Sequence, residues 1–426
     1  MTARPLPLAA RTHCPYCAYG CGILMGDDGA VAGDPHFPVN NGQLCINGWT
    51  ASALLGHPLQ LLTPLVRDRR TDPFRPATWD DALGRVAAAM TRTRAAHGAD
   101  ANGVFGSGAL TNEKAYLLGK FARVALGTAN IDFNGRYCMS SAAAGANRAF
   151  GIERGLPLPA TDVRHSDLVV LVGANSADTL PPIMQWLDAQ RADGGRLVVL
   201  DPRRTATTRA ANLHLQLAPG TDLVLANGLL YLLLEAGAVD AACVAARTVG
   251  FEAVRAIALQ HHPAHVERLT GVPESQLRTL AGWLTAAGSC LILSGRGCEQ
   301  HSKGVDTVHA WVNLALALGL PGKPFSGWGT LTGQGKGQGG REHGQKADQL
   351  PGYRLIENDA HREYTAGVWG VPPESLPRTG KSAFELLDSL GAGGCGRCSS
   401  SGRTWRWRRR TPGGSCRGWL AQISWL

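Results

Sequence analysis

Four cysteines near the start of the chain have the residue type and the spacing to bind an iron-sulfur cluster. The pattern is C-x2-C-x3-C followed by one later thiol, at Cys14, Cys17, Cys21 and Cys45. A [4Fe-4S] cluster needs one thiolate for each iron, and a short loop with one later turn can supply all of them. A structural zinc site is the alternative, although zinc sites usually present two C-x2-C halves. The pattern therefore predicts electron transfer.

A second candidate metal ligand is Cys138, which stands in the segment Asn-Gly-Arg-Tyr-Cys-Met-Ser-Ser-Ala-Ala-Ala-Gly. The small residues around it leave room for a bulky ligand beside the thiol. A lone cysteine is also commonly a buried apolar residue, which is how we interpret Cys243 and Cys290. The residues alone leave both interpretations of Cys138 open.

The elements expected to position these thiols alternate between helices and short apolar runs. Residues 78–96 predict a helix with Thr78 as its N-cap, and its apolar stripe is expected to pack in the core. The stripe consists of Trp79, Leu83, Val86 and Met90. Three apolar runs at 168–172, 197–200 and 291–293 predict buried parallel strands. This alternation indicates an α/β fold.

Small and polar residues follow each predicted strand, where open parallel sheets bind ligands. The segments are Gly173-Ala174-Asn175, Asp201-Pro202-Arg203 and Gly295-Arg296-Gly297, and a further turn at Pro219-Gly220-Thr221-Asp222 precedes an apolar helix. For any one of these segments, a plain loop is the better explanation. Together they favour a dinucleotide ligand.

The charge and hydropathy of the chain exclude several classes of protein. Of the net charge of +9, seven positive charges are arginines within 395–426, so the difference of +2 belongs to the rest of the 426 residues. The charge of residues 1–394 therefore does not indicate nucleic-acid binding. As an alternative, Trp405 and Trp407 among the arginines of the tail could form a basic aromatic arm that binds single-stranded nucleic acid. Polar residues interrupt the longest apolar stretch, at 223–246, and the N-terminus has no signal-peptide pattern. We expect a cytoplasmic protein without a membrane span.

Taken together, these motifs resemble the molybdopterin oxidoreductase family, and within it the assimilatory nitrate reductases. The resemblance covers roughly 12–390 and is carried by the cysteine quartet, by 137–141 around Cys138, and by the glycine-rich segment 331–354. It implies a small N-terminal iron-sulfur domain at 1–65, followed by interleaved Rossmann-like parallel-sheet domains at 66–394.

The resemblance also implies the cofactors and the residues that hold them. The cofactors would be a 4Fe-4S cluster and a molybdenum bis(molybdopterin guanine dinucleotide), with tungsten as an open alternative to molybdenum. Cys138 would ligate the metal. The expected pterin contacts are Asn134, Gly173, Asn175, Asp201, Arg203, Gly220, Thr221, Asp222, Arg296 and Gln300. Arg341, with His343 and Gln345, is the candidate anion site, or else grips a pterin phosphate or a backbone carbonyl.

The implied reaction is reduction of nitrate to nitrite by oxygen-atom transfer, with electrons supplied through the cluster. Ferredoxin, flavodoxin or a flavin-bearing reductase would deliver the electrons. Formate dehydrogenase-like activity is the first alternative, although Met139 follows Cys138 where formate dehydrogenases typically have histidine. An inactive remnant that binds a cluster or zinc is the second.

Three features depart from the family pattern. Asn47 stands where relatives usually have lysine, and Lys336 where they usually have asparagine, so we expect weakened activity. The family continues well beyond Leu390, whereas residues 395–426 are rich in Arg and Trp without periodicity. Regrouping permitted codons from the last base of Gly394 gives an apolar strand that ends in Gly-Ser-Asn. We therefore expect a frameshift, a missing C-terminal part, and a disordered or loosely packed tail.

Overall fold

The computed structural model describes residues 8–153, 155–335, 337–391 and 397–400. The chain forms two compact units, and each unit combines two separate stretches of sequence. Unit 1 comprises Met1–Ser52 and Tyr137–Gly333, and unit 2 comprises Ala53–Arg136 and Gln334–Leu426. The expected interleaving is confirmed. These units cut across the predicted boundary at residue 65, which stays a prediction for the family domains.

The centre of unit 1 is a five-stranded parallel sheet in the order β10-β9-β8-β11-β12. The three predicted strands are confirmed as β8 (Leu168–Val172), β9 (Arg196–Leu200) and β11 (Cys290–Ser294). The outer strands β10 (Leu213–Leu215) and β12 (Gly327–Thr330) were not predicted. They are short and contain His, Gly and Thr, so they lack a long apolar run that would mark them.

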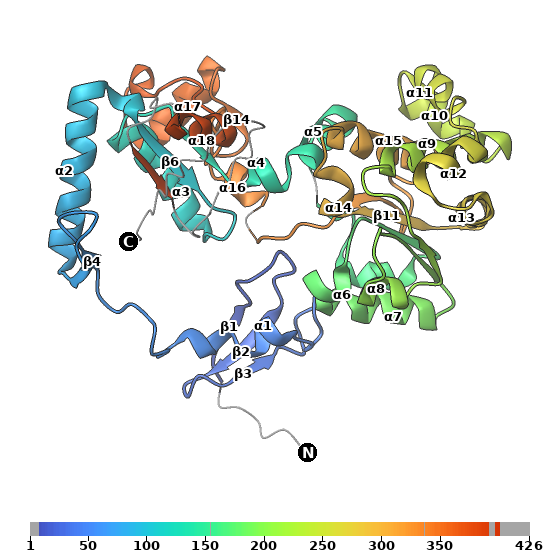
Figure 1. Ribbon diagram of the computed structural model, residues 1–426, viewed down its shortest axis with the longest axis horizontal. Helices are drawn as coiled ribbons and strands as arrows, with labels where there is room; N and C mark the ends of the chain where they lie inside the picture. Colours follow the sequence, from blue (N-terminus) through green and yellow to red (C-terminus); the bar gives the residue numbers. More distant parts are fainter. Residues whose placement is uncertain (1–7, 154, 336, 392–396, 401–426) are drawn as a thin grey trace. The chain divides into compact units, whose positions relative to one another are not determined.

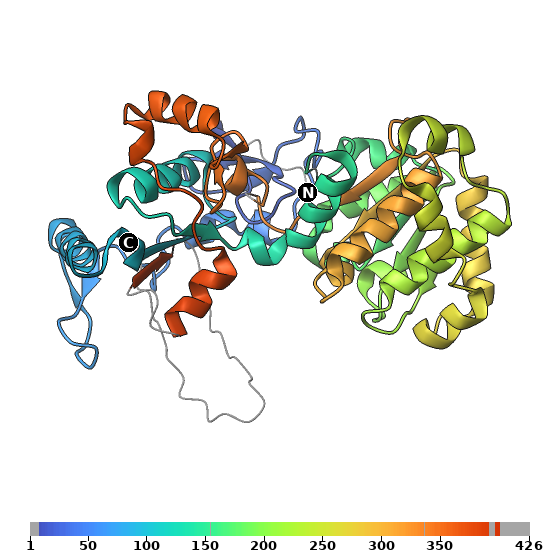
Figure 2. The same cartoon turned by 90° about the horizontal axis from the view of Figure 1, so that it is seen from above.

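Helices cover both faces of this sheet, because successive side chains of each buried strand point to opposite sides. Leu168, Val170 and Val172 face a core built with α9 (Asp222–Glu235), α13 (Glu274–Ala286) and α15 (Gly304–Ala317). Figure 2 shows the yellow α13 and the orange α15 beside the sheet. Val169 and Leu171 face the opposite core, to which α7 (Met184–Ala192) contributes. Figure 1 shows α7 with α6 (Ser176–Thr179) and α8 (Ala206–Arg209) on that side.

The cysteine region of unit 1 is a small antiparallel sheet of β1 (Leu8–His13), β2 (Gly22–Gly26) and β3 (Val31–Gly33). It is followed by the short helix α1 (Ile46–Trp49). Ile23 of β2 shares the second core with Leu187 of α7. Trp186 Nε1 donates to the Val39 carbonyl over 3.0 Å. The cysteine region therefore packs on the α7 side of the parallel sheet.

The remaining helices of unit 1 complete these two layers. Their bounds are η4 (Ala160–His165), α10 (Ala241–Arg247), α11 (Phe251–Ala258), α12 (Pro263–Thr270) and α14 (Arg296–Glu299), with α5 (Ser140–Phe150) after α4 (Gly135–Cys138). In the ranges that the structure describes, no helix is long and apolar enough to cross a membrane.

Unit 2 contains a three-stranded parallel sheet in the order β15-β6-β7. Its strands are β6 (Asn102–Gly106), β7 (Ile131–Phe133) and β15 (Arg397–Ser400). Residues 397–400, which belong to the predicted disordered tail, have an extended backbone that pairs with the edge of β6 that β7 leaves open, and disorder of the tail stays a prediction. The rest of 395–426 lies outside the described residues.

The other elements of unit 2 surround this sheet with short strands and helices. They are β4 (Leu65–Val66), β5 (Arg75–Pro76), α2 (Trp79–His97), α3 (Asn112–Lys120), a π-helical turn (Phe121–Ala125), α16 (Gly339–Glu342), β13 (Gln349–Leu350), β14 (Arg354–Leu355), α17 (Asp359–Trp369) and α18 (Ala383–Gly391).

Helix α2 confirms one prediction and contradicts another. Thr78 caps the helix, with its side chain accepting from Asp81 N over 3.2 Å. The apolar stripe, however, is not core: Trp79 is 55% and Leu83 48% exposed. Of the stripe, only Met90 packs against the small core that contains Val104 of β6. The first turns of α2 extend past the three-stranded sheet, so the residues before Met90 have no core to cover them.

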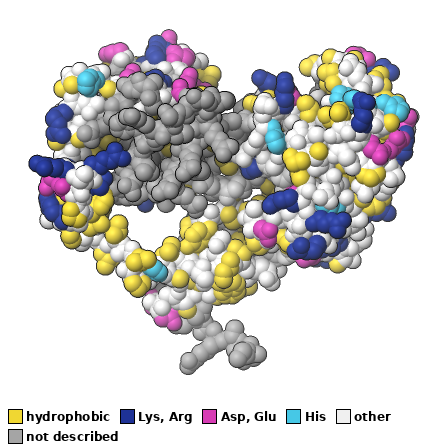
Figure 3. Space-filling model, viewed as in Figure 1, with side chains coloured by type: hydrophobic (Ala, Val, Ile, Leu, Met, Phe, Trp, Pro, Cys, Tyr) yellow, Lys and Arg dark blue, Asp and Glu magenta, His cyan; other side chains and the backbone are white. Residues whose placement is uncertain are grey.

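Apolar side chains also gather on the surface along the segment before β4 (Figure 3), where Leu54, Leu55, Leu59, Leu61 and Leu62 are exposed.

Candidate metal and cofactor sites

The four N-terminal cysteines come together at the end of the small antiparallel sheet. Cys14 N donates to the Cys21 carbonyl over 2.8 Å, which closes the loop between β1 and β2. Gly20 turns the loop with a φ of +59°, a conformation that favours glycine. Cys14 and Cys21 are buried, Cys17 and Cys45 are half-buried, and all four are free thiols. The thiols therefore converge from a loop and a later turn, as the spacing predicted.

The electrostatics of the quartet fit a cationic cluster. Burial raises the pKa of the Cys21 thiol to about 12, and the neighbouring Cys17, Cys14 and Cys45 add to the shift. Burial also raises the pKa of Cys14 and of Cys17. Thiolates in this setting need positive charge beside them, which iron supplies. Within the described ranges, no group of three or more His, Cys, Asp or Glu side chains is placed so that it could hold a metal ion.

Polar side chains hold the cysteine loop in place. Asn40 is fully buried, accepts from Gly22 N over 2.7 Å, and donates to the carbonyls of Gly22 and Gln43. Arg11 pairs with Asp34 over 3.0 Å, and this hydrogen bond lowers the pKa of the Asp34 carboxyl. These side-chain contacts join residues within the first 43 positions, while Ala18 N, inside the loop, also donates to the distant Gly333 carbonyl over 3.1 Å.

Cys138 lies where α4 ends, one residue before α5 begins. It is half-buried, and its carbonyl accepts from Arg296 Nη1 over 2.6 Å. The preceding carbonyl, of Tyr137, accepts from Gln300 Nε2 over 2.8 Å. Both donors come from the segment that follows β11. The structure thus places Arg296 and Gln300, two predicted pterin contacts, against the backbone of the predicted metal ligand.

The loops after β8 and β11 approach each other so closely that only glycine fits. Gly297 N donates to the Gly173 carbonyl over 2.9 Å, and Gly295 N donates to the Val172 carbonyl over 2.7 Å. A Cβ on Gly173, whose φ is +60°, would come within 2.4 Å of Cys298 N. These glycines bring two strand ends together at the edge where parallel sheets bind nucleotides.

Three polar side chains line the same carboxyl edge of the sheet. Asn175 accepts from Thr207 Oγ1 over 2.8 Å and donates to Asp178 over 2.6 Å. Asp201 is buried and accepts from Arg203 N over 2.8 Å. Asp222, the first residue of α9, is buried, and burial raises its pKa to about 6.

The other predicted nucleotide residues of unit 1 lie at the surface of this edge. The side chain of Arg203 is 73% exposed, with Nε 3.8 Å from Asp201. Gly220 has a φ of +81°, and Thr221 Oγ1 donates to the Ala218 carbonyl over 2.7 Å. An exposed guanidinium beside buried carboxyls suits a ligand with phosphates on the outside and a base further in.

Asn134 stands at the end of β7 in unit 2 and is tied to the glycine-rich segment. Its Oδ1 accepts from Gly108 N over 2.7 Å, and its Nδ2 donates to Gln334 Oε1 over 2.5 Å. Its predicted role as a pterin contact is not tested by these bonds.

The predicted anion residues of unit 2 lie within one turn of chain at and after α16. Arg341 is only 7% exposed, and burial lowers the pKa of its guanidinium to about 10. Gln345 is fully buried and accepts from Ser107 N over 3.1 Å through Oε1, while its Nε2 has no hydrogen-bond partner among the described residues. His343 Nδ1 lies 2.7 Å from the Gly339 carbonyl. A buried guanidinium and an amide donor without a partner are both groups that can bind an oxyanion.

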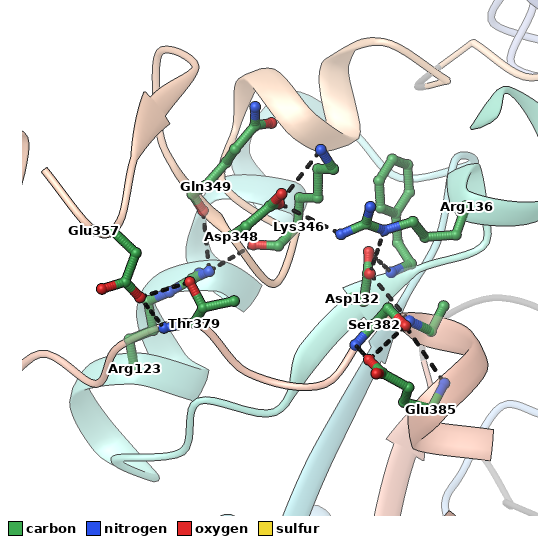
Figure 4. A network of polar contacts seen from close by, with 12 residues as sticks. Arg123, Asp132, Arg136, Lys346, Asp348, Gln349, Glu357, Thr379, Ser382 and Glu385 are labelled. Carbon is green, nitrogen blue, oxygen red and sulfur yellow. Dashed lines mark hydrogen bonds and ion pairs between the residues drawn. The ribbon is translucent and has the colours of Figure 1, made fainter. Parts of the chain in front are cut away.

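A network of charges supports this turn (Figure 4). Arg136 forms an ion pair with Asp132 over 2.6 Å. Asp348 forms ion pairs with both Arg136, over 3.4 Å, and Lys346, over 3.3 Å. Arg123 is almost completely buried and donates to four carbonyls, of Gly119, Gly344, Lys346 and Gln349. The network fixes the backbone that carries Arg341 and Gln345.

Sequence reasoning missed Glu299, which is 1% exposed and forms an ion pair with Arg296. Burial raises its pKa to about 7, against the opposing effects of Arg296 and of the Ala142 N–H. The sequence signal for this ion pair is an acidic residue three positions after the arginine in Arg-Gly-Cys-Glu-Gln, a spacing at which side chains on a helix meet. Asn47 is exposed on α1, and Lys336 lies outside the described residues.

Comparison with known families identifies the class of protein. The molybdopterin oxidoreductase model matches residues 61–372, and the molybdopterin oxidoreductase Fe4S4 domain model matches residues 9–55. The chain therefore belongs to the molybdopterin oxidoreductase family, a family of oxidoreductase enzymes. Its two matched domains are those of a molybdenum-pterin cofactor and a 4Fe-4S cluster.

Individual relatives narrow the likeness. The chain is 40% identical over 392 residues to the assimilatory nitrate reductase catalytic subunit of Bacillus subtilis, covering 90% of this chain and 54% of that protein. It is 35% identical to formate dehydrogenase H of Escherichia coli, covering 88% of this chain and 53% of that protein. The chain spans about half the length of the curated relatives it matches. Acetylene hydratase from Pelobacter acetylenicus has the same fold, with a TM-score of 0.64, 22% identity, and coverage of 72% of this chain and 43% of that chain.

Proposed function

We propose that this chain is the catalytic part of an enzyme that reduces nitrate to nitrite. The observation that carries the proposal is the likeness to the Bacillus subtilis nitrate reductase; it is supported by four free cysteines that are close enough to affect one another's pKa. The cofactor would supply two-electron chemistry: nitrate, two electrons and two protons give nitrite and water.

Each group of residues has a proposed role in this reaction. Cys14, Cys17, Cys21 and Cys45 hold the 4Fe-4S cluster that passes electrons one at a time, and Cys138 ligates the metal. Arg341 binds the anion, with Gln345 and His343 beside it. The support for this is the burial of the guanidinium and the spare Nε2 donor of Gln345.

We propose the bis(molybdopterin guanine dinucleotide) form of the cofactor. The supporting residues are at the carboxyl edge of the unit 1 sheet, where the Asp222 carboxyl can accept from a guanine amide and Arg203 can meet phosphate. Ferredoxin, flavodoxin or a flavin-bearing reductase would donate electrons in the cytoplasm.

The test begins with the full chain purified without oxygen. Iron, molybdenum, tungsten and zinc are measured, and nitrite production is assayed with a reduced viologen dye as electron donor. We expect iron at about four per chain, with molybdenum, and nitrite formation that C138S abolishes and the control C243S retains. Iron without molybdenum would support the inactive remnant, and zinc alone would overturn the cluster.

A formate dehydrogenase-like activity is the second candidate, favoured by the 35% identity to formate dehydrogenase H. The same preparation is assayed for formate oxidation with an oxidised dye. Turnover of formate without turnover of nitrate would replace the first proposal. R341M gives a further discrimination, because losing a charged donor to nitrate should raise its KM by about tenfold or more.

A further inference from the structure

The helical structure is interrupted between α4 and α5, next to Cys138. This helix break leaves backbone groups without regular helical partners. Met139, with φ −124° and ψ 6°, separates α4 from α5. The carbonyls at the end of a helix and the N–H groups at the start of the next one need partners from elsewhere. At this break, two carbonyls at the end of α4 accept from one segment of five residues, 296–300.

Side chains of this segment meet both sides of the break. Gln300 Nε2 donates to the Tyr137 carbonyl over 2.8 Å, and Arg296 Nη1 donates to the Cys138 carbonyl over 2.6 Å. On the other side, the Glu299 carboxylate is buried near the Ala142 N–H, in the first turn of α5, although neither of its oxygens has a hydrogen-bond partner among the described residues. The segment therefore gives hydrogen-bond donors to the last carbonyls of α4 and places a buried carboxylate near the start of α5.

The capping groups are also held against one another. Arg296 forms an ion pair with Glu299 and contacts Met139 Sδ and Thr330 Oγ1. The Arg296 side chain is 20% exposed and that of Glu299 is 1% exposed, so the pair is largely shielded from water. A planar guanidinium can reach several acceptors at once in fixed directions, which a lysine ammonium cannot do.

We propose that Arg296, Glu299 and Gln300 are positioning residues for Cys138, which lock the helix break so that the thiol meets its metal in one orientation. This inference rests on the proposed function only in taking Cys138 as the metal ligand. It gives Arg296 and Gln300 a role beyond nucleotide contact, and it brings in Glu299.

The decisive experiment measures local order in the full chain purified without oxygen and before molybdenum is inserted. Hydrogen exchange is followed at the amides of 139–143, and alkylation of Cys138 by iodoacetamide is followed by peptide mass spectrometry, with Cys243 as the internal reference. R296K keeps the positive charge but loses the planar guanidinium with its several N–H donors. E299Q removes the negative charge but keeps an oxygen acceptor. The matched control is E274Q, which alters the exposed Arg278–Glu274 pair of the same unit.

We expect R296K to speed exchange at 139–143 and alkylation of Cys138 by about tenfold, the loss of one hydrogen bond from a charged donor. E299Q should have a smaller effect in the same places, and E274Q none. Unchanged rates in R296K and E299Q would overturn the proposal. Equal acceleration throughout unit 1 would also overturn it, because the segment would then serve general stability. Since no turnover is measured, failure of the nitrate assay does not affect this result.

A second arm uses the molybdenum-loaded protein and the EPR signal of its Mo(V) state. A shifted or broadened signal in R296K, with the wild-type signal retained in E274Q, is the expected result. An identical signal in R296K and wild type would overturn the claim that the break orients the thiol.

Discussion

Unit 1 presents thiols in two regions that are organised in opposite ways. The cysteine loop is held by side chains from the first 45 residues, since Asn40 and Asp34 bind the backbone of neighbouring turns, although Ala18 N also donates to the distant Gly333 carbonyl. The carbonyls of Cys138 and Tyr137 accept from donors that lie 158 and 163 positions away in the sequence. The first region is therefore readable from spacing, whereas the second acquires its surroundings only when the parallel sheet has formed.

The largest test of this contrast is to remove one thiol from each region. We expect C21S to lower iron from about four to below one per chain, because each cluster iron needs its own thiolate. C138S should keep its iron, and C243S, in α10, serves as the control for a substituted cysteine. Iron analysis measures the iron content of each variant, and EPR after reduction with dithionite detects the cluster. Loss of iron in C138S would break the contrast, since the two regions would then depend on each other.

A substitution at Asn40 tests how far the cysteine loop depends on its own neighbourhood. N40A removes three hydrogen bonds and leaves the buried Gly22 N–H without its Asn40 partner, so the free energy of unfolding should fall by about 2–4 kcal/mol. Urea denaturation measures the loss. Q60A is the control, because Gln60 makes a single exposed bond to Gly56 N. A change below about 0.5 kcal/mol in N40A would show that the loop is held by something else.

The long-range side of the contrast includes Asp222, whose pKa is raised to about 6 mainly by burial. The folded chain then binds a proton that the unfolded chain has already lost between about pH 4 and pH 6. The free energy of unfolding of the cofactor-free protein should therefore fall by about 2–3 kcal/mol as the pH rises through this window. D222N should flatten this dependence, and the exposed D306N should not. Parallel curves for D222N and wild type would contradict the assignment.

The smallest effect is expected at a purely local contact outside both thiol regions. T78A removes the N-cap of α2 and should cost about 1 kcal/mol, which thermal unfolding can detect. T78S keeps the hydroxyl and should restore the wild-type value. Equal stability of T78A and wild type would show that this cap contributes nothing.

The predictability of the fold follows the same division between local and distant contacts. Strands β8, β9 and β11 could be predicted because uninterrupted apolar runs mark strands buried on both faces. The exposed stripe of α2 could not, since periodicity shows that a helix has an apolar face but not what covers it. The short strand β15 in the tail has no apolar pattern, and only its pairing with β6 defines it.

The residues of the candidate sites also fall into those that local sequence patterns predict and those that depend on distant contacts. The cysteine spacing predicted the thiols that the structure gathers together, and the strand ends predicted a binding edge at Gly173 and Asp201. Glu299 was missed because its importance depends on burial beside Arg296 and α5, which no local pattern encodes. The assignment of individual residues to pterin or nitrate stays a prediction.

The discontinuous make-up of unit 1 has a consequence for how the protein is made. Residues 1–52 leave the ribosome early, but the sheet face on which they pack includes β11, which is translated almost 240 residues later. Contacts with such long sequence separation form slowly. During synthesis the cysteine loop therefore waits without its packing partner, with its thiols open to oxidation and to zinc.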